Sequence, residues 1–106
     1  MILFKPEHVP MILNREKTQT RRFGKKRWRV GAIHQCKTTL FGEPFARVRI
    51  DAIRKERLGH ISKQDANAEG YPDRASFFRV FEEINGPIHP IQPVWVLTFT
   101  LVEVPE

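Results

Sequence analysis

The sequence lacks several features that would assign it to whole classes of protein. Its only cysteine is Cys36, so no disulfide can form within the chain. No stretch approaches the roughly 20 apolar residues that a membrane-spanning helix needs. The opening residues, MILFKPEHVP, are too short in their apolar run, and too interrupted by Pro6, Glu7 and Pro10, for a secretory signal. These absences predict a cytoplasmic protein that is not inserted in a membrane.

The chain also lacks the sequence motifs of metal and cofactor chemistry. Its histidines, His8, His34, His60 and His89, are scattered, and no pair has the spacing of metal ligands. There is no glycine-rich phosphate loop and no G-x-S-x-G nucleophile motif. Cys36 precedes a lysine, which favours a reactive thiol, but an isolated cysteine in a strand is more often a packing residue. We therefore expect no metal site and no cofactor.

Acidic residues are scarce in the first half of the chain. The net charge is +6 and the pI is about 10.0. Residues 1–53 contain twelve Lys and Arg against four acids, whereas residues 54–106 contain six against eight. A basic excess gathered in one half is typical of a surface that meets polyanions, although charge also keeps a protein soluble. The length of 106 residues predicts a single domain over residues 1–106 with one modest core.

The first half of the chain favours short strands and one helix. Residues 2–4 are apolar and favour a strand, and Pro6 favours a helix start. That helix would bury Val9, Ile12 and Leu13 on one face. Residues 18–22 and 32–39 favour strands, and the period of two in residues 45–53 predicts a half-buried one. Its buried face is expected to hold Ala46, Val48, Ile50 and Ala52.

The second half favours two helices and a long strand. Ser62 can cap the first helix, with Asp65 as its capping-box partner and Gly70 as its stop. Asp73 can cap the second, whose inner face would carry Phe77, Phe78, Phe81 and Ile84. Residues 94–104 favour a strand covered on both faces. Because strands and helices do not alternate regularly, we predict an α+β fold, a small mixed β-barrel of about five to six strands with two to three short helices packed on it.

A basic segment with two aromatic residues runs from Arg15 to Arg29 and contains eight basic residues against one acid. Arginines bind phosphates and aromatic rings stack on exposed bases, so the segment is typical of single-stranded nucleic-acid binding. The candidate nucleic-acid-binding residues are Arg15, Arg21, Arg22, Lys25, Lys26, Arg27, Trp28, Arg29, and, from the strand over residues 45–53, Arg47 and Arg49. The alternative is a solvated loop whose Trp28 folds back onto the core.

Three motifs together resemble the ASCH domain family, and the likeness extends over residues 2–104. They are ILNREKTQTRR at residues 12–22, AEGY at residues 68–71 followed by an aromatic-rich helix, and the closing VWVLTF strand. The sequence departs from the family where Asn14 and Arg15 replace the usual glycine before the lysine, and where Gly31 is followed by Ala32 rather than aspartate. The resemblance implies a fold related to the PUA domain, which is a small β-barrel with helices attached. It also implies binding to RNA or action on RNA or its nucleosides.

The resemblance also implies a set of catalytic residues. One bacterial branch of the family hydrolyses the acetyl amide of N4-acetylcytidine with a lysine, a threonine and a glutamate, which fall on Lys17, Thr20 and Glu69. In those roles Lys17 is the base, Thr20 the nucleophile and Glu69 the acid. Lys17 must then be neutral, which requires a pKa below its ordinary value. In a straight strand Lys17 and Thr20 would face opposite sides, so the chain must turn near Lys17 or Thr18.

Three other interpretations stay open on the residues alone. The first is a binding module that grips single-stranded RNA or a nucleoside without chemistry, and the second is a ribonuclease, as other members of the family imply. The third is that Lys17 and Glu69 form a purely structural ion pair. DNA binding also stays open, although no expected helix is basic enough to act as a recognition helix.

Overall fold

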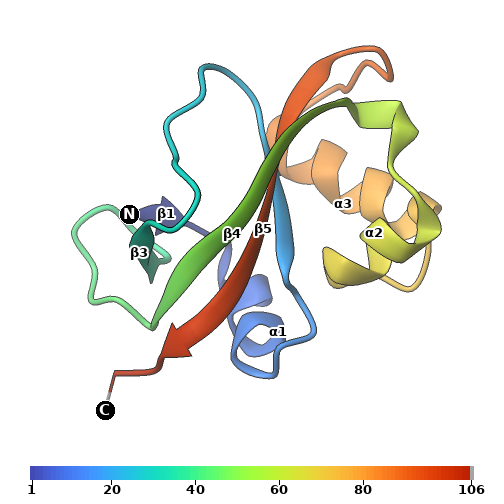
Figure 1. The fold of residues 1–106 in the computed structure, drawn as a ribbon. Helices are drawn as coiled ribbons and strands as arrows, with labels where there is room; N and C mark the ends of the chain where they lie inside the picture. The colour runs from blue at the N-terminus through green and yellow to red at the C-terminus, as the bar shows by residue number, and fades with distance from the viewer. Residues whose placement is uncertain (106) are drawn as a thin grey trace.

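The fold is built on one five-stranded mixed sheet, and the computed structural model describes residues 1–105 (Figure 1). The strands are β1 (Ile2–Leu3), β2 (Gln19–Arg22), β3 (Ile33–Lys37), β4 (Ala46–Arg57) and β5 (Pro93–Glu103). Their order is β1-β3-β4-β5-β2, with β1 parallel to β3 and the other pairs antiparallel. The sheet forms a half-barrel, and the predicted α+β class is confirmed.

Short helices precede β2 and follow β4 along the chain. The 3-10 turn η1 (Pro6–His8) leads into α1 (Val9–Leu13), and η2 (Leu58–His60) precedes α2 (Lys63–Ala68) and α3 (Arg74–Asn85). The Ser62 hydroxyl accepts the Asp65 amide at 3.0 Å and the Asp73 carboxylate accepts the Ser76 amide at 2.7 Å, so both predicted caps are confirmed. Figure 1 shows α2 and α3 on one side of β4 and β5, and β1 and β3 on the other.

The first helix is shorter than predicted. The chain takes a tighter 3-10 turn at Pro6 and becomes α-helical only at Val9. Pro10 then lies in the first turn of α1, where its missing N–H costs no hydrogen bond. Ile12 is buried as expected, but Leu13 lies at the surface because the helix ends there.

A bulge in β4 overturns part of the predicted strand pattern. Ala46, Val48 and Ile50 are fully buried, as the alternation predicts. The register against β5 shifts between Ile50 and Ala52, so Ala52 is exposed and Ile53 packs against the core instead. A bulge places two residues opposite one and moves the inward face by one position. The strand also runs on to Arg57, because β5 offers it partners as far as Pro93.

The core has two clusters that share β5 as their boundary. One cluster lies inside the half-barrel and includes Ile12, Val48 and Phe99. The other lies between the sheet and the helices and includes Phe77 and Val96. Both faces of β5 are therefore covered, as predicted, and a buried strand is the reason that its sequence is apolar almost throughout.

Two further observations concern the helices. On α3, Phe77 and Phe81 are buried, whereas Ile84 lies exposed, contrary to the predicted inner face. None of the helices within residues 1–105 combines the length and the apolarity needed to cross a lipid bilayer.

Candidate functional site

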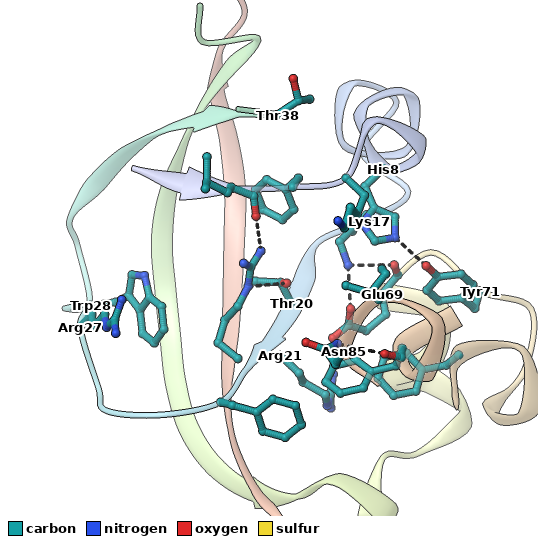
Figure 2. A pocket seen from close by; sticks show the side chains of 18 residues that line it. His8, Lys17, Thr20, Arg21, Arg27, Trp28, Thr38, Glu69, Tyr71 and Asn85 are labelled. Carbon is teal, nitrogen blue, oxygen red and sulfur yellow. Dashed lines mark hydrogen bonds and ion pairs between the residues drawn. The ribbon is translucent and has the colours of Figure 1, made fainter. Parts of the chain in front are cut away.

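A cavity of about 470 Å³ opens between β2, the N-terminal segment and the helices α2 and α3 (Figure 2). This volume lies in the range of pockets that bind small molecules, about 300–1,000 Å³. Its walls include Lys17, Thr20, Arg21, Arg22, Arg27, Trp28, Glu69 and Tyr71. Figure 2 shows Lys17, His8, Glu69 and Tyr71 gathered on one side, with Arg27 and Trp28 on the other.

The backbone before β2 explains why Lys17 and Thr20 reach the same cavity. Residues 16–18 are neither helix nor strand, so the alternation of a straight strand does not apply to Lys17. The Thr18 amide donates to the Ala68 carbonyl at 2.7 Å, and the Thr18 carbonyl accepts the Phe99 amide at 2.9 Å. These two bonds hold the segment between the end of α2 and β5, and so bring Lys17 beside Glu69.

Lys17 and Glu69 form a buried ion pair in the cavity wall. The Lys17 side chain, 2% exposed, donates from Nζ to Glu69 Oε1 at 2.6 Å and to the Glu69 carbonyl at 3.1 Å. Burial lowers the pKa of Lys17, against the opposing attraction of the Glu69 carboxylate. The shift has the direction that a lysine base requires, because it raises the neutral fraction at a given pH.

Gly70 allows Glu69 to take this position. Glu69 caps the end of α2, and Gly70 follows with a φ of +105°, in the region that favours glycine. A Cβ on Gly70 would lie 2.7 Å from Met11 Sδ. The residue predicted to stop the helix therefore also permits the close packing of α1 against the turn that carries Glu69.

Arg21 is a buried structural cation, which differs from its expected role at the surface. Its side chain is fully buried, and the guanidinium donates to Glu69 Oε2 at 2.9 Å, Glu56 Oε1 at 3.0 Å and Asp65 Oδ2 at 3.2 Å. With three carboxylates around it, this guanidinium is not free to bind a phosphate. The predicted capping box at Ser62 is only half formed. The Asp65 amide donates to the Ser62 hydroxyl, but the Asp65 carboxylate accepts from Arg21 and Arg54 rather than from the Ser62 amide.

Thr20 and Arg22 lie together on the opposite face of β2. The Arg22 Nε donates to Thr20 Oγ1 at 3.3 Å, and its Nη2 donates to the Leu3 carbonyl at 2.8 Å. The guanidinium lies over the Phe4 ring, 5.1 Å from the centroid. Burial lowers the pKa of Arg22, although a guanidinium stays charged at any working pH.

His8 and Tyr71 form a second polar pair in the wall, which the sequence analysis did not identify. His8 Nε2 lies 2.5 Å from the Tyr71 hydroxyl, and His8 is 8% exposed. Burial lowers the pKa of His8 to about 4 and raises that of Tyr71 to about 12. Both are therefore neutral near pH 7, so Tyr71 donates and His8 accepts. The only sequence signal was that Tyr71 belongs to the AEGY motif.

The other residues predicted to bind nucleic acid lie either on one loop or on the outer surface. Lys25, Lys26 and Arg29 are exposed on the loop that carries Arg27 and Trp28 to the cavity. Trp28 is half-buried and packs at the edge of the core while it lines the cavity.

Three predicted nucleic-acid-binding arginines lie outside the set that lines the cavity. Arg15 donates to the Leu101 carbonyl, Arg47 pairs with Glu103, and Arg49 pairs with Asp51. Arg15 also has a left-handed φ of +64°. The role of these arginines in binding nucleic acid outside the cavity stays a prediction.

Cys36 is fully buried, and burial raises the pKa of its thiol to about 12. Such a thiol is not a nucleophile at neutral pH. Cys36 packs in the core inside the half-barrel. No group of three or more metal-ligating side chains comes together within residues 1–105.

Comparison with known proteins identifies the fold. No protein-family model matches the sequence, and no curated protein matches it. Among solved structures, an ASCH domain from Lactobacillus crispatus JV V101 matches 88% of this chain and 69% of its own, with a TM-score of 0.67 and 20% identity. Protein EF3133 from Enterococcus faecalis V583 matches 92% of this chain and 68% of its own, with a TM-score of 0.73 and 16% identity.

A third structure extends the same likeness. ASCH from Zymomonas mobilis matches 93% of this chain and 64% of its own, with a TM-score of 0.68 and 13% identity. The predicted resemblance is therefore confirmed at the level of the fold, since the chain folds as an ASCH domain.

Proposed function

We propose that this ASCH-fold chain binds a nucleoside or nucleotide of RNA in its cavity and hydrolyses the acyl amide of an N4-acylated cytidine. The observation that carries the proposal is the placement of Lys17, which is almost fully buried yet lines a cavity, with its amine bonded to Glu69. A buried lysine of lowered pKa in a cleft is typical of a functional site. Thr20 supplies a hydroxyl in the same wall.

The chemistry requires a nucleophile, a base and an acid. The Thr20 hydroxyl accepts a hydrogen bond from Arg22, so its own proton is free to leave toward a base. The Lys17 ammonium first passes a proton to Glu69 across their 2.6 Å contact. Neutral Lys17 then takes the Thr20 proton, and the coupled pair returns a proton to the departing amine. Glu69 keeps the proposed role of acid as a member of this pair.

Hydrolysis of N4-acetylcytidine tests the proposal directly. We expect the purified chain to release cytidine, measured by chromatography, and Lys17→Met to abolish the release, because methionine fills the space without a base. Lys63→Met is the matched control, since Lys63 is exposed on α2. Absence of turnover by the natural chain, or full turnover by Lys17→Met, would refute catalysis at this site.

Binding of single-stranded RNA without catalysis is the second candidate. It is favoured by Lys25, Lys26, Arg27 and Arg29, which form no ion pair with a carboxylate among the described residues. A labelled single-stranded RNA should then bind with an affinity that falls steeply as salt rises. Shortening of the RNA, seen with the natural chain but not with Lys17→Met, would instead identify a ribonuclease.

A further inference from the structure

Neighbouring arginines on β2 have opposite electrostatic environments. Arg21 is surrounded by three carboxylates, whereas Arg22 forms no ion pair with any carboxylate in the described part of the chain. Arg22 nevertheless lines the cavity and is largely shielded from solvent. A shielded charge without a counter-ion is costly, so an anion that enters the cavity would be stabilised beside Arg22.

The guanidinium of Arg22 is held in place by three independent contacts. Its Nη2 is bonded to the Leu3 carbonyl, its Cζ lies over the Phe4 ring, and its Nε is bonded to Thr20 Oγ1. Donors that are fixed before a reaction stabilise developing charge without reorganising, which is the main requirement of an oxyanion site. The contact with Thr20 also places the cation next to the oxygen that would attack a substrate.

We propose that Arg22 is a catalytic residue that stabilises the oxyanion formed when Thr20 attacks the acyl carbonyl. The inference rests on the proposed hydrolysis. Thr20 Oγ1 bonds to the acyl carbon, its proton moves to neutral Lys17, and the carbonyl π electrons move to the oxygen that faces Arg22. The oxyanion re-forms the carbonyl as the C–N4 bond breaks, N4 takes a proton from the Lys17–Glu69 pair, and cytidine leaves. Water then attacks the acyl ester on Thr20 and gives a proton to Lys17, and Lys17 passes this proton to the Thr20 oxygen as the carboxylic acid leaves.

The alternative role of Arg22 is to bind an RNA phosphate. The two roles separate on N4-acetylcytidine, because this nucleoside carries no phosphate. An oxyanion residue acts only in the transition state, so its loss lowers kcat and leaves KM nearly unchanged. A phosphate-binding residue would leave both constants unchanged on this substrate.

The experiment is steady-state hydrolysis of N4-acetylcytidine by the natural chain, Arg22→Gln, Arg22→Lys and Arg79→Gln. Arg79→Gln makes the same change of charge at an exposed position of α3. We expect Arg22→Gln to lower kcat by about 100-fold or more at similar KM. Arg22→Lys, which keeps the charge and so protects the fold, should lower kcat by about 10-fold, because an ammonium does not reproduce the guanidinium fork. Arg79→Gln should match the natural chain.

The outcomes are decisive once circular dichroism shows which variants are folded. Either folded Arg22 variant with a kcat within about twofold of the natural chain overturns the oxyanion role while the hydrolase proposal stands. A raised KM with unchanged kcat also overturns it, since this is the pattern of ground-state binding. No turnover by the natural chain overturns the proposed hydrolase and this role together.

Discussion

Protonation of His8 should destabilise the fold in mild acid. Neutral His8 accepts the Tyr71 hydroxyl at 2.5 Å, and the protonated ring would replace this acceptor by a donor, near the charge of Lys17. The pKa of His8 is lowered from 6.5 to about 4 on folding. The unfolded chain therefore binds more protons between these values, and stability falls as pH drops below 6.5. With these pKa values the loss between pH 7 and pH 4.5 is about 2 kcal/mol.

Urea unfolding of the natural chain and of His8→Gln at both pH values measures this loss. Glutamine keeps an oxygen that can accept from Tyr71 but does not titrate. Carboxylates lose stabilising contacts in acid in both proteins, so their contribution cancels when the two pH dependences are subtracted. We expect the natural chain to lose about 2 kcal/mol more than His8→Gln. His60→Gln, at an exposed position, should keep the full pH dependence of the natural chain. If the free energy of unfolding falls equally with pH in the natural chain and in His8→Gln, protonation of His8 does not destabilise the fold.

Three other predictions concern the ion network, the turn before Tyr71 and the basic loop. Arg21→Met should lower the free energy of unfolding, measured in urea, by about 3–5 kcal/mol, because it leaves carboxylates without their cation. A loss under about 1 kcal/mol would contradict a stabilising role of the network. Gly70→Ala should lower the melting temperature more than Gly24→Ala, since both have positive φ but only Gly70 is crowded, by Met11; equal losses would exclude crowding. Replacing Lys25 and Lys26 by glutamine should reduce the log–log salt slope of single-stranded RNA binding by about 1.4 if both contact phosphates, and an unchanged slope would place the RNA elsewhere.

Charge is unequally distributed in the cavity wall, and the proposed function depends on this difference. Lys17 and Arg21 are neutralised within the protein by Glu69 and its neighbours, whereas Arg22 and Arg27 face the cavity without a carboxylate partner in the described chain. An incoming group therefore meets an ion pair on one side and uncompensated positive charge on the other. This arrangement suits an uncharged amide that becomes an anion during its reaction.

The local patterns of the sequence were sufficient to predict most elements of the fold. Ser62 and Asp73 cap their helices because a side-chain oxygen satisfies amides two or three residues away, which needs no tertiary contact. The motif that carries Lys17 and Thr20 is likewise contiguous. The bulge that exposes Ala52 was not predictable, because register is decided by the partner strand.

Only the tertiary structure determined which charges meet. Lys17 and Glu69 are 52 residues apart, and their pairing depends on the contact of Thr18 with the end of α2. Arg21 and Arg22 are adjacent and chemically identical, yet one faces carboxylates of α2 and β4 and the other faces the cavity. Composition and spacing report how many charges a segment carries. Burial and partners set what each charge does, and these arise when distant segments pack together.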